Sequence, residues 1–306
     1  MKKRFLIFIV TLVASSSYAQ QDAQFTNYMY NTININPAYA GSRGILSVFG
    51  LHRNQWVGLD GAPVTNTFSL NTPISNSNFG IGFSVINDEI GPAVENSISV
   101  DISYTIKTSE TYKLSFGLKA TGNLLDVDFT KLNIFNPGDK LGQSNIDNRF
   151  SPNVGAGLFL HSDKTYFGVS VPNFLETKHF EVGQTASSLA AERLHYYFIG
   201  GHVFDVNSNI KFKPAFLTKL VQGVPLQVDL SGNFLINDKF VVGAAYRWSA
   251  AVSLLTGFQI TDGLFIGYGY DFETTRLANY NSGSHEIFLR FELFSNKSRI
   301  VSPRFF

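Results

Sequence analysis

The stretch PLQVDLSGNFLINDKFVVGAAYRWSAAVSLLTGFQITDGLFIGYGYDF, residues 225–272, decides the fold, because it reads as four strands laid end to end. In the first strand Leu226 and Val228 belong to one face, whereas the intervening Gln227 belongs to the other. The same alternation continues through three further runs separated by short turns of Asn, Asp, Ser and Gly. This period-2 pattern is typical of strands with one apolar and one wet face. Strands of about ten residues with aromatic residues near their ends favour the wall of a transmembrane barrel.

The composition agrees with a β protein in a membrane. Charged residues make up 15% of the 306 residues, well below the roughly 25% of soluble domains. Aromatic residues reach 14%, with 29 Phe and 13 Tyr. The chain has no cysteine, so disulfides, thiolate metal sites and a lipidated N-terminal cysteine are all excluded. The formal net charge of +1 gives no reason to expect nucleic acid as a partner.

Residues 1–19 have the pattern of a secretory signal peptide. A basic start at Lys2, Lys3 and Arg4 precedes an apolar run over residues 5–13. A small-x-small cleavage pattern ends at Ala19, so we expect the mature chain to begin at the next residue. The apolar run is too short to span a bilayer. Export together with barrel strands predicts the outer membrane of a Gram-negative cell.

Residues 20–43 show no strand alternation, although they carry many apolar side chains among Asn, Gln and Thr. They include the run Asn36, Pro37, Ala38, Tyr39, Ala40 and Gly41, whose Pro and Gly indicate a fixed turn. One interpretation is a loosely ordered leader. The favoured one is a periplasmic segment that packs against the barrel or enters it as a plug.

The rest of the chain predicts about fourteen strands over residues 44–294, followed by a periplasmic tail at 295–306. The first strand is expected at 44–52. Short turns alternate with mostly longer connections, which is the rhythm of outer-membrane barrels with long loops outside. The expected outer connections are 53–63, 126–151, 172–193 and 273–283. An even number of strands places both termini in the periplasm. A soluble β-sandwich is the rival, but its wet faces normally carry more charge.

Charged residues recur at the positions expected to face inward. They are either the lining of a conducting pore or an ion-pair network across the lumen, and their balanced signs favour a network or a plug. The positive set is Lys113, Lys119, Lys211, Lys213, Lys219, Arg247 and Arg290, and the negative set is Asp101, Asp229, Asp271, Glu286 and Glu292. We also interpret six glycines as facing the lumen or bending the wall: Gly41, Gly44, Gly80, Gly82, Gly155 and Gly157.

No catalytic or metal-binding pattern emerges from the sequence. The six histidines are not in a nucleophile-elbow or metal-ligand spacing. Four loop aspartates, Asp126, Asp128, Asp139 and Asp147, include the oxygen ligands that Ca²⁺ prefers, but their spacing matches no known loop. A solvated loop is the favoured interpretation. We therefore expect no enzyme activity, no cofactor and no metal.

Several motifs resemble one family. In order they are QFTNYMY (24–30), NPAYAGS (36–42), RNQWVGLDGAPVT (53–65), NDEIGP (87–92), SHEIFLRFEL (284–293) and SPRFF (302–306). Together they resemble the PorP/SprF family of outer-membrane proteins of the type IX secretion system of Bacteroidetes. The resemblance implies a role in secretion and, in some members, gliding motility. It also implies partners: outer-membrane lipids, large secreted cargo with a type B C-terminal domain, and periplasmic type IX or peptidoglycan-linked components.

The motif near Trp56 supplies further candidate partner-binding residues. Arg53, Gln55, Trp56 and Asp60 offer aromatic and hydrogen-bonding contacts of the kind enriched at interfaces, and Gly61 and Pro63 complete the matching motif. Alternatively, Trp56 belongs to the interfacial aromatic belt of the barrel. The competing function for the whole chain is a channel for small solutes or hydrophobic compounds.

Overall fold

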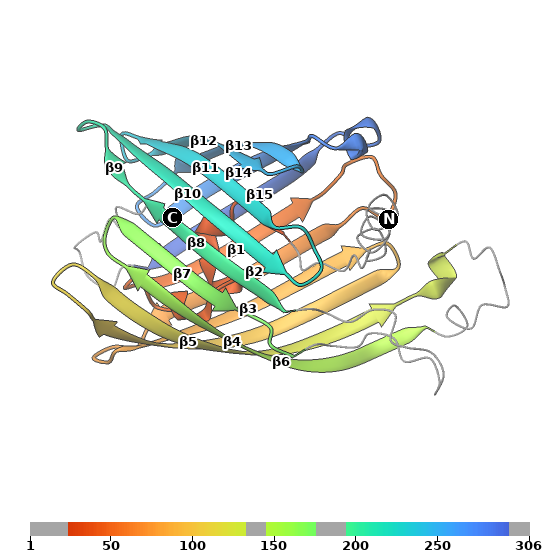
Figure 1. Ribbon diagram of the computed structural model, residues 1–306, viewed down its shortest axis with the longest axis horizontal. Helices are drawn as coiled ribbons and strands as arrows, with labels where there is room; N and C mark the ends of the chain where they lie inside the picture. The colour runs from red at the N-terminus through yellow and green to blue at the C-terminus, as the bar shows by residue number, and fades with distance from the viewer. Residues whose placement is uncertain (1–23, 133–144, 176–193, 294–306) are drawn as a thin grey trace, which may run out of the picture.

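The protein forms a closed barrel of antiparallel strands around a segment from its own N-terminus (Figure 1). The computed structural model describes residues 24–132, 145–175 and 194–293. The strands are β1 (Leu46–Asn54), β2 (Val64–Pro73), β3 (Phe79–Ile90), β4 (Ala93–Lys107), β5 (Lys113–Val127), β6 (Ile146–His161), β7 (Thr165–Val171), β8 (His195–His202), β9 (Phe204–Asp205), β10 (Ile210–Val221), β11 (Gln227–Ile236), β12 (Phe240–Arg247), β13 (Ala251–Gln259), β14 (Leu264–Glu273) and β15 (Ser284–Leu293).

Each strand pairs with its neighbours in the sequence, and β15 pairs with β1 to close the ring. Strands β8 and β9 are separated by Val203, and both pair with β10, so they form one position in the wall. The barrel therefore has fourteen strand positions. Closure leaves no unpaired edge among the described strands, which the hydrocarbon region of a membrane requires. The prediction of an all-β up-and-down barrel with about fourteen strands is confirmed.

Alternation along each strand separates the lipid face from the lumen. Leu230 is 53% exposed, whereas its neighbours Asp229 and Ser231 are 6% and 9% exposed. The same holds at the end of the chain, where Ile287 is exposed and Glu286 is buried. The facing predicted for residues 225–272 and for the last strand is confirmed. In an aqueous β protein this pattern would be inverted, because the exposed set here is the apolar one.

The barrel has two different mouths. The short-turn mouth is formed by the connections 74–78, 108–112, 162–164, 206–209, 237–239 and 260–263. The long-loop mouth is formed by 55–63, 91–92, 222–226, 248–250 and 274–283, together with the described ends of two further connections, 128–132 with 145 and 172–175 with 194. Two of these last connections, 91–92 and 248–250, are themselves short, so the alternation of loop lengths is not strict.

Several predicted strand boundaries are wrong. Strand β1 ends at Asn54, so Arg53 belongs to a strand and not to the following loop. Strands β5 and β6 extend to Val127 and back from Ile146, into the connection expected at 126–151. Residues 146–150 are exposed or half-buried at every position. Alternation fails there as a signal because both faces of this extension are wet.

Some predictions concern residues outside the described ranges. These are the signal peptide at 1–19, the tail at 295–306 and Asp139 in the expected Ca²⁺ loop. Among the described residues, no helix has both the length and the apolar character needed to cross a membrane.

Candidate functional site

Residues 24–45, which we call the lumen segment, run through the inside of the barrel (Figure 1). The segment makes three 3-10 turns, η1 (Tyr28–Tyr30), η2 (Thr32–Asn34) and η3 (Pro37–Tyr39). It ends next to β1 at the short-turn mouth. At its other end the Gln24 Nε2 donates to Gln227 Oε1 at 2.7 Å, at the start of β11 and so at the long-loop mouth.

The segment therefore crosses the lumen from one mouth to the other. The first described residue, Gln24, and the last, Leu293, lie at opposite mouths, because Leu293 pairs with Leu46 at the short-turn end of β1. The two ends of the wall, Leu46 and Leu293, do share a mouth, as an even strand number requires. The expectation that both chain termini share one side stays a prediction for residues outside the described ranges.

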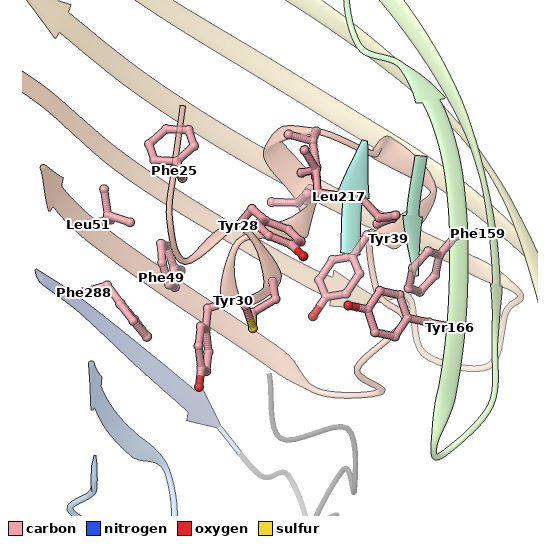
Figure 2. Packing of buried hydrophobic residues seen from close by; sticks show 14 of the residues in the cluster. Phe25, Tyr28, Tyr30, Tyr39, Phe49, Leu51, Phe159, Tyr166, Leu217 and Phe288 are labelled. Carbon is pink, nitrogen blue, oxygen red and sulfur yellow. The ribbon is translucent and has the colours of Figure 1, made fainter. Parts of the chain in front are cut away.

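Aromatic and apolar side chains fill the space between the lumen segment and the wall (Figure 2). Met29 and Ile33 are each 1% exposed. The ring of Tyr30 lies 4.6 Å from Phe288 and 5.4 Å from Phe265, and Tyr39 meets Phe159 edge-on at 5.5 Å. Full burial of one such side chain contributes about 1.5–3 kcal/mol. The segment is thus a packed part of the core and not a loose leader.

The motif at residues 36–41 docks on wall positions that have no side chain. The Asn36 Oδ1 accepts from the backbone N–H of Ala38 at 3.0 Å and caps η3, while its Nδ2 donates to the Leu158 carbonyl at 3.0 Å. A Cβ at Gly117 would collide with the backbone of Ala38, and one at Gly157 would collide with Asn36. Only glycine at these positions lets the segment approach the wall this closely.

The other end of the motif is seated in the same way. The Ser103 Oγ donates to the Ala40 carbonyl at 2.7 Å, and a Cβ at Gly80 would meet that same carbonyl. Gly41 has φ +69°, which favours glycine, and a Cβ there would collide with the backbone of Gly80 and Pro73. Pro37 occupies the first turn of η3, where a missing N–H costs nothing. All six motif residues therefore serve contact with the barrel's inner wall.

The predicted set of inward-facing or bending glycines divides into groups. Gly80, Gly82 and Gly157 face the lumen segment, where a Cβ would meet Ala40, Ile33 and Asn36. Gly155 instead lies against Pro172. Gly44 has φ +78° with open space around it, so it serves the turn into β1.

A buried ion-pair cluster holds the segment near the long-loop mouth. We name it the Arg53 cluster: Thr26, Arg53, Asp271 and Glu286. The Arg53 guanidinium lies 2.7 Å from Asp271 Oδ2 and 3.0 Å from Glu286 Oε2, and all three side chains are at most 2% exposed. Arg53 also donates to Thr26 Oγ1 at 3.0 Å, and Glu286 accepts from the backbone N–H of Thr26 at 3.0 Å.

The Arg53 cluster joins three strands to the lumen segment, because its members come from β1, β14 and β15. Glu286 also accepts from the backbone N–H and the side-chain amide of Asn27, at 2.8 and 2.6 Å. Charge-assisted hydrogen bonds to buried carboxylates are the strong class of such bonds. The cluster therefore holds the barrel wall and the segment in one arrangement.

Other lumen charges are paired as well. Arg43 pairs with Glu292 beside the short-turn mouth. Lys119 lies 3.1 Å from Asp101, and Arg247 lies 3.1 Å from Asp229. Lys211 pairs with Asp238 at the rim, while Lys113 is exposed there. Lys213, Lys219 and Arg290 are buried in the lumen, with Lys213 lying 5.5 Å from the centre of the Tyr30 ring. Of the two interpretations of these charges, the structure favours the ion-pair network around a plug.

The candidate group around Trp56 is divided by the structure. Arg53 is 1% exposed and faces the lumen, so it does not share a surface with Trp56. The Trp56 indole N–H donates to Glu273 Oε1 at 2.8 Å along the rim of the long-loop mouth, and the Gln55 N–H donates to the Pro63 carbonyl at 3.0 Å. Asp60 and Gly61 are exposed at the tip of this connection. These residues form part of the long-loop rim.

Sequence reasoning missed Arg43 and Thr26 as contacts of the lumen charges. Arg43 sits in a stretch without periodicity, so nothing in the pattern assigned it a direction. Its partner Glu292 was correctly placed inside, and a surplus of inward acids near the end of β15 was the available signal. Arg53 was missed as a lumen residue because the strand was predicted to end at residue 52, two residues before its actual end at Asn54.

The described residues contain no group of three or more His, Asp or Glu side chains placed to hold a metal ion. Two of the loop aspartates have structural roles instead. The Asp126 Oδ1 accepts from the Asn148 N–H at 2.7 Å. Hydrogen bonds from the Thr130 hydroxyl and N–H lower the pKa of Asp128, which caps η4 (Phe129–Lys131).

Comparison with known proteins identifies one family. The model of a family described as "Type IX secretion system membrane protein PorP/SprF" matches residues 17–291. None of the curated proteins matches the chain. Solved barrels that resemble it include outer membrane protein Omp33 of Acinetobacter baumannii, at 11% identity and a TM-score of 0.47, with 81% of this chain and 98% of that chain covered. The CymD monoaromatic hydrocarbon channel gives 12% identity and a TM-score of 0.47, with 84% and 91% covered. These likenesses add nothing to the architecture described above.

Proposed function

Because the chain belongs to the PorP/SprF family of type IX secretion system membrane proteins, we propose that it is a plugged outer-membrane barrel that supports the secretion and surface attachment of large cargo proteins. The proposed cargo carries a type B C-terminal domain, and the further partners are outer-membrane lipids and periplasmic type IX or peptidoglycan-linked components. A contribution to gliding motility belongs to the same proposal.

The observation that carries the proposal is the filled lumen in a member of a secretion family. The lumen segment is hydrogen-bonded to β1, β2, β4, β6, β7, β14 and β15. Its apolar side chains pack against the wall between these hydrogen bonds. A cargo polypeptide moving through this barrel would have to displace all of these contacts. We therefore assign the protein a role as a partner-binding barrel beside the secretion route.

The filled lumen also separates this function from the competing one. A channel for small solutes needs a continuous aqueous path, and the segment crosses that path from mouth to mouth. We expect no stable conductance from the purified protein in planar bilayers. Ohmic conductance of the porin type, unaltered by changes in the lumen segment, would favour the solute channel.

The test of secretion uses a strain that lacks the protein. Loss of one or a few large surface proteins, with their accumulation in the periplasm and unchanged levels of unrelated outer-membrane barrels, is the expected result. Complementation by the wild-type chain restores them. A deletion strain with a normal complement of surface proteins and normal motility would contradict the proposal.

The sidedness of the barrel is part of the proposal. Since longer connections normally face outward, the long-loop mouth is assigned to the cell surface and the short-turn mouth to the periplasm. Cysteines replacing exposed Asp60 and exposed Ser208 provide one probe at each mouth. A membrane-impermeant thiol reagent on whole cells is expected to label the first and spare the second. The reverse labelling pattern would show that the barrel has the opposite orientation in the membrane.

A further inference from the structure

The outer face of the barrel carries a groove of about 610 Å³ over β4, β5, β6 and β7, which lie side by side in the wall (Figure 1). We call it the outer groove. Its lining extends from Phe79, the first residue of β3, to Val171, the last residue of β7. The lining residues at outward-facing positions are Phe79, Ile102, Tyr104, Phe116, Leu118, Ala156, Leu158, Val169 and Val171.

The groove follows from a notch in the wall at Ala156. Two rows of directly paired residues form this part of the outer face, Ile102–Leu118–Ala156–Val171 and Tyr104–Phe116–Leu158–Val169. Ala156 has the smallest side chain in either row. Behind the notch, Gly117 and Gly157 also line the groove, and these are the glycines on which residues 36–41 dock from the inside. The wall is therefore only one backbone thick at this place.

Two glycines elsewhere on the outer face are covered by aromatic rings of the protein itself. A Cβ at Gly122 would meet the ring of Phe150, and a Cβ at Gly232 would meet the ring of Phe212. Covering a glycine with an aromatic side chain from the neighbouring strand is a device that stabilises β-sheets. Ala156 differs from these glycines because it lines an open groove. The chain thus leaves this notch to be filled by another molecule.

A hydrocarbon chain is the molecule that fits the outer groove. The groove is continuous with the apolar, lipid-facing surface of the wall, where Leu118 is 63% exposed. Among the residues that the structure describes, none with a charge lines it, so it offers nothing to an ionic group. Its volume lies within the range of about 300–1,000 Å³ that is usual for small-molecule pockets. In a bilayer the acyl chains of lipids surround this surface and are long, thin and apolar.

Tyr104 indicates which end of the groove is polar. It pairs with Phe79, beside the 74–78 turn of the short-turn mouth, and the two rings lie 4.9 Å apart. Tyrosine favours the boundary between hydrocarbon and headgroups, because its ring is apolar and its hydroxyl is polar. A lipid headgroup therefore belongs near Tyr104, and the acyl chain extends from there toward Val171.

We propose that the outer groove binds one phospholipid from the leaflet at the short-turn mouth, with an acyl chain lying over Ala156. The bound chain supports the wall from outside at the place where residues 36–41 dock from inside. This inference goes beyond the proposed role in secretion and does not depend on it, because lipid binding is measured on the purified barrel. Normal secretion in a deletion strain and failure of lipid binding are therefore separate results.

The test is native mass spectrometry of the full-length protein in detergent, titrated with dioleoyl phosphatidylethanolamine. We expect the first lipid to bind about tenfold more tightly than later ones, because the burial of two additional methylene groups is enough for that factor. Glycerophosphoethanolamine is the control, since it has the same headgroup without acyl chains, and we expect it not to bind. Equal affinity of the first and later lipids, or equal affinity of the chain-free control, would overturn the proposal.

Variants place the lipid at the outer groove. Ala156→Phe fills the notch with an aromatic ring and is expected to weaken binding of the first lipid about tenfold, because the ring excludes at least two methylene groups from the groove. The matched control is Ala244→Phe, which adds the same ring at an exposed position of β12 outside the groove. We expect this control to bind lipid as the wild type does. An equal loss in both variants would mean a general surface effect, and a wild-type dimer that Ala156→Phe converts to a monomer would show that the groove is a contact between two copies; either result overturns the proposal.

Heat-modifiable migration on gels verifies that each variant is folded. If Ala156→Phe does not fold, the wild-type protein in phosphatidylethanolamine vesicles provides a second test, with a diazirine at the end of an acyl chain in a fraction of the lipid. We expect photo-crosslinks to concentrate on the lining residues of β5, β6 and β7. Crosslinks spread evenly around the barrel wall would contradict the proposed site.

Discussion

The two halves of the lumen segment are attached to the same barrel by different means. Near the long-loop mouth, Thr26 and Asn27 are held by the Arg53 cluster, where charge supplies the attraction. Further along, residues 36–41 are held by hydrogen bonds and by shape, against glycines of the wall. The first attachment depends on balance between charges, and the second depends on the absence of side chains. We therefore expect the two attachments to respond to different kinds of substitution.

The largest effect is expected from Arg53→Met. The change leaves Asp271 and Glu286 buried without their shared cation, and removing one partner of a buried pair costs about 3–5 kcal/mol. The melting temperature in detergent should fall strongly, with loss of heat-modifiable migration. The control is Lys107→Met, which removes an exposed positive charge at the end of β4. Equal stability of the two variants would show that the charges of the Arg53 cluster are not required.

The role of charge in this attachment can be tested further by neutralising all three charged residues of the Arg53 cluster. A triple variant with Arg53→Met, Asp271→Asn and Glu286→Gln leaves no buried charge unpaired, and we expect it to recover part of the stability lost in Arg53→Met. The comparison is made in urea at one detergent concentration. If the loss of stability in the triple variant equals the sum of the losses in the three single variants, the residues of the Arg53 cluster are not energetically coupled.

A smaller effect is expected from Gly117→Val, which adds side-chain atoms where the backbone of Ala38 now lies. Overpacking of this kind costs about 1–3 kcal/mol. The wall strand itself can accept valine, so the lumen segment should be displaced and conductance should appear. The matched control is Gly50→Val, at a strand glycine with open space around it. A Gly117→Val variant without conductance and with unchanged stability would mean that the lumen segment adapts to the added side chain and is not held by shape.

The smallest effect is expected from Asn36→Ala. It removes the cap of η3 and the bond to the Leu158 carbonyl, and loss of such a cap costs about 0.5–2 kcal/mol. Asn66→Ala is the control, because it also removes two side-chain hydrogen bonds, to His52 and Asn87, but at an exposed position. The unfolding midpoint in urea should fall for Asn36→Ala and stay nearly constant for Asn66→Ala. Equal shifts of the unfolding midpoint in the two variants would show that burial of the motif does not contribute to stability.

The sequence by itself determined the wall of this protein. Strict alternation in residues 225–272 fixes which side chains meet lipid, because a strand has a period of two and a shift by one residue would reverse every side chain. The same rule placed Asp229, Asp271 and Glu286 inside the barrel before any contact was known. Motifs shared with a known family indicated the secretion role.

Only the tertiary structure decided how the lumen is filled. The lumen segment has no repeating pattern, so its direction, its three 3-10 turns and its exit beside Gln227 follow from contacts with strands far away in the sequence. The sequence suggested that Gly157 faces the lumen or bends the wall, but it could not show that the lumen segment docks on Gly117 and Gly157, because that depends on which atoms lie opposite them. Arg53 also needed the fold, because its partners Asp271 and Glu286 lie more than two hundred residues away. Local periodicity encodes the wall, whereas long-range packing alone encodes the plug.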